Sequence, residues 1–321
     1  MKSIYFIRIF IVLLSLYHLI PFISSSYSSP DLEKESINTN PNNNTKLKIV
    51  TSFYPLYEFT NAVGGEKIDI TTLIPIGVEP HDWEPSPQKI TELQNADIII
   101  YNGIGFDSWL SDSSSIDKSK LVDVSKGVNL IELKQEDKGS SNDKSSFDPH
   151  IWLDPLIAKN ITQTISSYLI KLDPANAYYY KQNTERFTEQ LDLLDKEIKK
   201  SLSNCELNEF ISFHEAFQYF ANRYGLTQYS VQGLSPAGEI LPQQISKIIS
   251  LAKNLNINTI YSEELKDPRL AEILASELPN GSVLLLSPIE GIDKEEQKNN
   301  ISYLDKMKTN TEHLVKGLRC N

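Results

Sequence analysis

Three of the five histidines in the chain stand at junctions between predicted secondary-structure elements. His81 follows a short apolar run, His150 precedes a predicted helix, and His214 separates a predicted strand from a helix. Neutral imidazole is the commonest zinc ligand, at about 2.0–2.1 Å, and three imidazoles with one further ligand complete a tetrahedral shell. In α/β proteins, ligands bind at the carboxyl ends of the strands. The three histidines therefore predict one divalent-metal site.

A second interpretation stays open, because these histidines are far apart and no HExxH or Cys-Cys-His-His pattern joins them. Each could instead be a hydrogen-bonded structural residue. The other two histidines are not candidates for the site. His18 lies in an apolar N-terminal segment, and His313 is expected on a solvated face of a helix at 303–318.

The segments around the histidines alternate between apolar strands and helices, which is typical of parallel α/β sheets. The predicted strands are 47–53, 68–74, 97–101, 121–124, 210–213, 228–231, 257–261 and 283–286. The predicted helices are 55–63, 87–95, 215–224, 242–255 and 268–278, with Asp154 as the N-cap of another that follows His150. This pattern predicts an N-terminal lobe at 47–172 and a C-terminal lobe at 204–321.

A long helix is predicted between the two lobes, at 173–203. Apolar side chains recur there at helical spacing, and no Gly or internal Pro interrupts them. Asp173 and Pro174 supply an N-cap followed by proline at the first helical position. At about 1.5 Å per residue the helix exceeds about 40 Å, so it would limit the relative motion of the lobes.

The N-terminal 23 residues predict an export signal or an uncleaved N-terminal anchor, because Lys2 and Arg8 precede an apolar run. No Cys follows this run, so a diacylglyceryl-Cys anchor is not expected. Residues 24–46, rich in Ser, Asn and Pro, predict a flexible linker. We therefore expect an exported protein, in the periplasm or at the cell surface.

The two cysteines, Cys205 and Cys320, form no CxxC pattern, so a thiolate metal site is not expected. In an oxidising compartment such a pair predicts one disulfide, with two separate thiols as the alternative. A formal net charge of −11 and the lack of Lys and Arg clusters argue against nucleic acid as a partner. A monomer is expected.

Four segments resemble the zinc and manganese solute-binding proteins of ATP-binding-cassette importers, the cluster A-I family. They are Gly77-Val-Glu-Pro-His-Asp-Trp-Glu-Pro-Ser-Pro, Asp148-Pro-His-Ile-Trp-Leu-Asp-Pro, Ser212-Phe-His-Glu-Ala-Phe-Gln-Tyr-Phe and Gly233-Leu-Ser-Pro-Ala-Gly-Glu. The first three contain the histidines singled out above, and the resemblance extends over essentially all of the ordered chain.

The resemblance implies an α/β fold of two lobes, each a four-stranded parallel sheet flanked by helices, joined by one long rigid helix. It implies that the protein is not an enzyme but captures a divalent metal ion between the lobes and delivers it to the permease of an ABC importer. His81 and His150 would come from the first lobe and His214 from the second. Because the family's third ligand is His in zinc-type and Glu in manganese-type members, His214 favours Zn(II) over Mn(II).

The sequence departs from the family at the fourth ligand. The family usually has Asp just after the last strand, where this chain has Ser287. A neutral hydroxyl is a poor metal ligand, so water is expected at the fourth position, with the carboxylates of Glu79, Glu263 and Glu239 as alternatives. The loop at 134–147 lacks the histidine-rich tract of many zinc-type members.

The neighbours of the histidines have two interpretations each. Glu79, Asp82 and Asp154 could orient imidazole N–H groups, or could cap helices and face water. Trp83 and Trp152 could line a cleft or pack in the core.

Three other functions are alternatives to the capture of Zn(II) for an importer. A Mn(II)- or Fe(II)-binding solute-binding protein is the first. A zinc hydrolase is the second, since catalytic zinc also has three protein ligands and water, although the sequence lacks HExxH and nucleophile-elbow motifs. A surface adhesin is the third, and no residue argues for or against it.

Overall fold

The computed structural model describes residues 46–81, 83–133, 146–234 and 240–321. The predicted export segment lies outside the described residues, as do the predicted linker apart from Lys46 and most of the predicted loop at 134–147. Asp82 and Glu239 also lie outside them. Within the described ranges, no helix combines the length and the apolar character that a membrane span requires.

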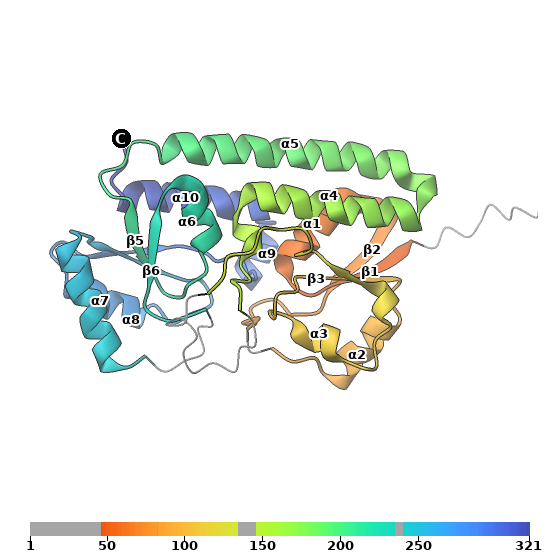
Figure 1. Ribbon diagram of the computed structural model, residues 1–321, viewed down its shortest axis with the longest axis horizontal. Coiled ribbons are helices and arrows are strands. Elements are labelled where there is room, and N and C mark those ends of the chain that lie inside the picture. Colours follow the sequence, from red (N-terminus) through yellow and green to blue (C-terminus); the bar gives the residue numbers. More distant parts are fainter. Residues whose placement is uncertain (1–45, 82, 134–145, 235–239) are drawn as a thin grey trace, which may run out of the picture. The chain divides into compact units, whose positions relative to one another are not determined.

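The first lobe is a four-stranded parallel sheet in the order β2-β1-β3-β4 (Figure 1). Its strands are β1 Leu47–Thr51, β2 Ile68–Thr72, β3 Ile98–Tyr101 and β4 Leu121–Asp123. Its helices are α1 Tyr54–Gly64, α2 Pro87–Gln94, α3 Ser108–Asp112 and α4 Pro155–Leu172. The strand β3, Ile-Ile-Ile-Tyr, is buried along its whole length because helices cover both faces of the sheet.

The second lobe repeats this arrangement in the order β6-β5-β7-β8. Its strands are β5 Glu209–Ser212, β6 Thr227–Ser230, β7 Thr259–Ser262 and β8 Ser282–Leu285. Its helices are α6 Gln218–Tyr224, α7 Pro242–Asn254, α8 Arg269–Ser276, α9 Lys294–Lys298 and α10 Tyr303–Gly317. The predicted fold class, two four-stranded parallel sheets with flanking helices, is confirmed.

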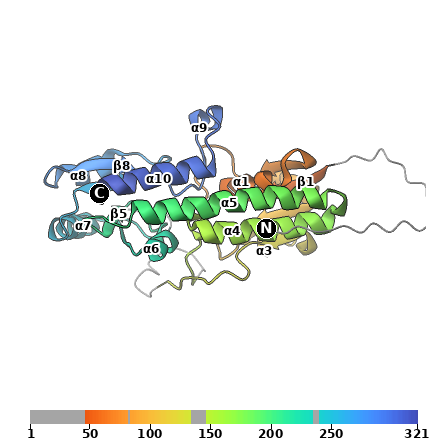
Figure 2. The same ribbon diagram turned by 90° about the horizontal axis from the view of Figure 1, so that it is seen from above.

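The long helix α5, Ala177–Ser201, joins the two lobes. It packs beside α4 in the first lobe and beside α10 in the second (Figures 1 and 2). At about 1.5 Å per residue its 25 residues extend about 38 Å. Asp173 is the N-cap and Pro174 the first residue of a 3-10 turn, Pro174–Asn176, that leads directly into α5. The Asp173 carboxylate makes no capping bond and instead accepts hydrogen bonds from the Asn176 and Tyr180 side chains.

One hydrophobic core continues from the first lobe into the second under α5. It includes Phe53 and Trp152 from the first lobe, Leu191 from α5, and Phe210 and Tyr303 from the second. Tyr303 in α10 donates a hydrogen bond from its hydroxyl to the Trp152 carbonyl at 2.6 Å. The two lobes therefore share a continuous core on the side covered by α5.

Two sequence-based expectations concern the C-terminal part. The disulfide between Cys205 and Cys320 is confirmed, and it ties the start of the second lobe to the end of the chain. The expectation that His313 lies on a solvated face of its helix is wrong. Its ring is half-buried between α10 and β8, and Nδ1 lies 2.6 Å from the Leu285 carbonyl, to which it donates.

Candidate metal centre

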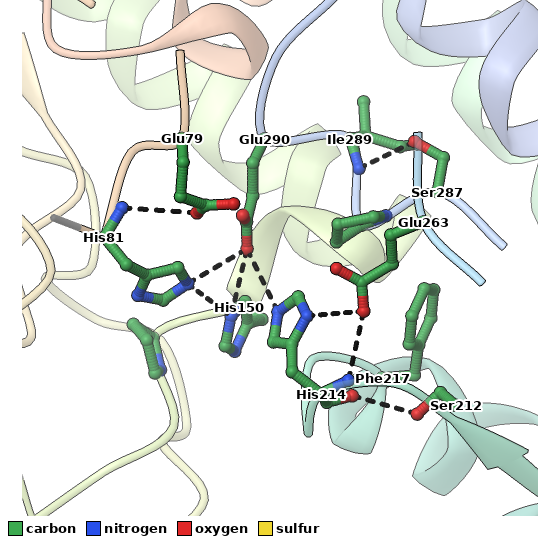
Figure 3. Close-up of polar contacts among 12 residues, drawn as sticks. Glu79, His81, His150, Ser212, His214, Phe217, Glu263, Ser287, Ile289 and Glu290 are labelled. Carbon is green, nitrogen blue, oxygen red and sulfur yellow. Dashed lines mark hydrogen bonds and ion pairs between the residues drawn. The ribbon is translucent and has the colours of Figure 1, made fainter. Parts of the chain in front are cut away.

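Four side chains converge at one point between the lobes: His81, His150, His214 and Glu290 (Figure 3). One ligand atom from each lies within 4.8 Å of every other. Glu290 Oε1 is 3.1 Å from His81 Nε2 and 3.3 Å from the Nε2 atoms of both His150 and His214. The Nε2 atoms of His150 and His81 are 3.4 Å apart. Three imidazoles thus present the same ring nitrogen to one carboxylate.

These separations match the edges of a tetrahedral zinc shell. Ligands at about 2.0–2.1 Å from a tetrahedral ion are about 3.3–3.4 Å from one another. Four of the six separations in the cluster, 3.1, 3.3, 3.3 and 3.4 Å, are close to that edge, and all six are within 4.8 Å. The donor set, three nitrogens and one oxygen, also suits Zn(II).

Each ligand side chain comes from the loop at the carboxyl end of a strand. His81 follows β2, His214 directly follows β5, and Glu290 lies in the loop after β8. His150 immediately precedes the 3-10 turn Ile151–Leu153, which leads into α4. Parallel strands align their carboxyl ends at one edge of each sheet, and the two edges face each other here. The first lobe supplies two imidazoles, and the second supplies one imidazole and the carboxylate.

Buried carboxylates orient two of the imidazoles. His150 Nδ1 lies 2.7 Å from Asp148 Oδ1, and His214 Nδ1 lies 2.7 Å from Glu263 Oε1. Since a carboxylate accepts, each Nδ1 carries the proton, which leaves the Nε2 lone pair directed at the centre. Both rings are fully buried, so water does not compete for these bonds.

The His214 Nε2 atom is buried and makes no hydrogen bond. It faces a carboxylate oxygen at 3.3 Å, and when His214 is neutral with its proton on Nδ1 both atoms offer lone pairs. Buried acceptors that face one another without a donor are unfavourable. A cation at the common centre would satisfy this nitrogen and the other three ligand atoms together, so the cluster fits a metal ion.

The charges of the centre shift the pKa values of its members. Burial disfavours the imidazolium of His214, but Glu263 and Glu290 outweigh burial and raise the pKa of His214 well above its usual value. The pKa of His150 is raised for the same reason, by Asp148 and Glu290 against burial. Burial alone would raise the pKa of Glu290, yet the histidines hold it well below the usual range. Protons and a metal ion therefore compete for the same site.

The carboxylates expected near the fourth position have other contacts. Glu263 holds His214 through its Nδ1 and also accepts from the His214 backbone N at 3.0 Å. Glu79 accepts from the His81 backbone N at 3.4 Å and pairs with Lys266 at 3.2 Å. Neither belongs to the cluster that could hold the ion. The carboxylate that lies among the imidazoles is that of Glu290, which the sequence did not suggest as a candidate.

Glu290 was not predicted, because the resemblance placed the fourth ligand at Ser287, three residues earlier. Ser287 is buried, and its hydroxyl contacts Glu264 rather than the histidines. A usable signal was present, because Glu290 is the first acidic residue after the last strand. The role of Asp148 in orienting His150 was also not predicted, although Asp148 stands two residues before His150.

The remaining neighbours now have definite roles. Asp154 is the N-cap of α4, as predicted, accepting from Leu156 N at 2.8 Å and Ile157 N at 3.2 Å. Trp152 is fully buried, and its ring centroid lies 5.2 Å from that of His150. Trp83 packs against Trp109 with ring centroids 5.4 Å apart. Both Trp83 and Trp152 therefore pack against other aromatic rings.

Comparisons with known proteins agree with this geometry. The chain matches the family described as zinc-uptake complex component A, periplasmic (ZnuA), over residues 49–317. The high-affinity zinc uptake system protein ZnuA of Bacillus subtilis is 38% identical over 284 residues, which are 85% of this chain and 88% of that protein. The zinc-binding protein AdcA of Streptococcus pyogenes is 34% identical over 286 residues. These are 84% of this chain but 55% of AdcA, so the chain spans about half the length of the AdcA relatives.

Solved structures show the same fold. The metal-dependent lipoprotein YcdH from Bacillus subtilis superposes with a TM-score of 0.74 at 38% identity, covering 85% of this chain and 100% of that one. The laminin-binding protein Lmb of Streptococcus agalactiae superposes with a TM-score of 0.76 at 28% identity, with coverage of 85% and 100%. The resemblance seen in the sequence is thereby confirmed. The chain belongs to the ZnuA family of zinc-uptake components, which are solute-binding proteins and not enzymes.

Proposed function

We propose that this chain captures Zn(II) with His81, His150, His214 and Glu290 and delivers it to the permease of an ABC importer. The observation that carries this proposal is the convergence of four ligand atoms within 4.8 Å of one another, with four of their six separations at tetrahedral edge distances. Relatives named as zinc uptake and zinc-binding proteins support zinc as the ion. Three imidazoles favour Zn(II) over Mn(II), which prefers carboxylate and water.

Capture and release follow from the division of the ligands between the lobes. His81 and His150 belong to the first lobe and His214 to the second, and Glu290 lies on a second-lobe loop that also accepts hydrogen bonds from Gly77 and Trp152 of the first. Binding would draw the lobes together, and a small opening at the strand ends would divide the shell into two weaker halves. We therefore propose that the permease releases the ion by separating the lobes, while α5 and the shared core limit how far they open.

The further features of the proposal are its boundaries and its place in the cell. We propose that residues 47–172 and 204–321 act as the two metal-binding halves and 173–203 as the stiff connection. An exported monomer, at the periplasmic or outer surface of the membrane, is the form that would serve a permease. Relatives named as periplasmic components and as lipoproteins support this location.

A hydrolytic function has less support from the geometry. A catalytic zinc keeps one position open for water or substrate. Here the fourth position is filled by Glu290, which lies 3.1–3.3 Å from the three imidazole nitrogens and is 3% exposed. A closed shell suits capture and storage of an ion.

Metal analysis of the purified protein tests the proposed function. We expect one zinc per chain and its loss in His81→Ala, His150→Ala and His214→Ala. His313→Ala is the matched control, since this histidine bonds to a backbone carbonyl away from the cluster. Full zinc retention in the three variants, or a Mn(II) affinity above that for Zn(II) in competition calorimetry, would contradict the proposal.

A further inference from the structure

Glu290 lies in the loop between β8 and α9. Two residues of the first lobe form hydrogen bonds to the backbone of this loop, one on each side of Glu290. Gly77 donates its backbone N–H to the Ile292 carbonyl at 2.9 Å. Trp152 donates from Nε1 to the Pro288 carbonyl at 2.8 Å. The carboxylate therefore projects from a loop whose backbone is fixed both before and after it.

Ser287 is the most constrained residue of this loop. Its backbone N donates to Asn310 Oδ1 at 2.8 Å, and its carbonyl accepts from Asn310 Nδ2 at 2.7 Å. Its hydroxyl donates to Glu264, which is itself paired with Lys306 at 2.9 Å. The same hydroxyl oxygen accepts from the Ile289 backbone N at 3.0 Å. Ser287 is 4% exposed, so these bonds form away from water and are correspondingly strong.

The hydrogen bond to Ile289 has a specific consequence for the backbone. Ile289 has a φ of +56°, in the left-handed region that β-branched residues rarely adopt. Its side chain is fully buried. Figure 3 shows Ser287 joined to the Ile289 backbone, with Glu290 directed from the next position toward the three imidazoles. An unfavourable conformation next to a ligand persists only where neighbouring contacts enforce it.

We propose that Ser287 is a positioning residue for the metal centre. Its hydroxyl holds Ile289 in the left-handed conformation, and this turn places the Glu290 carboxylate among the imidazoles. Ser287 does not touch the ion. Without the hydroxyl, Ile289 can relax toward a negative φ, which would rotate the following residue away from the cluster. The proposal rests on the proposed function, because it requires Glu290 to be a metal ligand.

A double-mutant cycle in the full chain tests it, with zinc dissociation constants measured by chelator competition. We expect Ser287→Ala to raise the dissociation constant about 10- to 100-fold, the range for residues that orient metal ligands. In a Glu290→Gln background the same substitution is expected to add no more than about twofold. Thr162→Ala is the matched control, because this buried hydroxyl donates its hydrogen bond to the Ala158 carbonyl of its own helix.

A second pair of variants keeps the test decisive if Ser287→Ala does not fold. Ser287→Thr retains the hydroxyl, whereas Ser287→Val has the same shape without it. We expect the Thr variant to bind zinc at least tenfold more tightly than the Val variant. Equal affinities in this pair, or a full Ser287→Ala effect in the Glu290→Gln background, would overturn the proposal. Unchanged zinc affinity in Glu290→Gln alone would instead refute the proposed ligand set.

Discussion

The substitution Glu263→Gln tests the role of the negative charge on the carboxylate that accepts a hydrogen bond from His214 Nδ1. Glu263 Oε1 lies 2.7 Å from His214 Nδ1 and 3.0 Å from the His214 backbone N, and a glutamine oxygen can accept both bonds. The substitution therefore keeps the geometry and removes the negative charge. A hydrogen bond to a charged, buried partner contributes about 1.5–3 kcal/mol. We expect zinc affinity to fall about 10- to 100-fold at pH 8.

The pH dependence of this variant supplies an internal check. In the wild type, Glu263 raises the pKa of His214, so protons compete with zinc as the pH falls. Removing the charge lowers that pKa, which reduces proton competition in the variant. The affinity ratio of wild type to variant should therefore shrink between pH 8 and pH 6.

Chelator-competition titrations at both pH values measure this ratio, with Glu79→Gln as the control. Glu79 contacts the His81 backbone and Lys266 but no imidazole ring, so its variant should change affinity less and without the same pH trend. Wild-type affinity in Glu263→Gln at pH 8, or a ratio that grows as the pH falls, would refute the argument that this carboxylate supports His214.

Three further predictions follow from other contacts. As the pH is lowered, the zinc affinity of the wild type should already begin to fall before pH 6.5 is reached, because the pKa values of His150 and His214 are raised and zinc binding needs neutral rings. Calorimetry that shows a constant affinity from pH 8 to pH 6 would contradict this. Replacing Cys205 and Cys320 by serine should lower the free energy of unfolding by about 2–5 kcal/mol in urea titrations while zinc affinity holds. Asp154→Ala should cost about 1 kcal/mol as a lost helix cap, seen as a lower Tm, and an unchanged Tm would count against the cap.

The fold could be predicted largely because buried parallel strands leave strong patterns. The run Ile98–Tyr101 is apolar throughout, and the predicted strand at 97–101 differs from it by one residue. Helix starts are weaker signals. The helix predicted from 215 begins at Gln218, because the backbone of residues 214–216 instead turns His214 into the cleft, with the Glu215 N–H bonded to the Gly233 carbonyl.

The site could be predicted only in part, for a physical reason. The chain has five histidines, and three of them stand at the ends of predicted elements, which made them recognisable in the sequence. The structure brings these three together. Glu290 reaches them through the left-handed turn at Ile289, which neither periodicity nor composition encodes. Glu263 supports His214 across 49 residues of sequence, so only the packing of β5 beside β7 reveals the pair. Contacts that depend on loop conformation and on the order of strands in the sheet could not be predicted from the sequence.

A crystal structure of the zinc-loaded protein, with anomalous scattering recorded at the zinc edge, would locate the ion itself. We expect one zinc peak at about 2.0–2.1 Å from the Nε2 atoms of His81, His150 and His214 and from a Glu290 carboxylate oxygen. A zinc ion bound elsewhere, or bound at this point without imidazoles from both lobes, would contradict it.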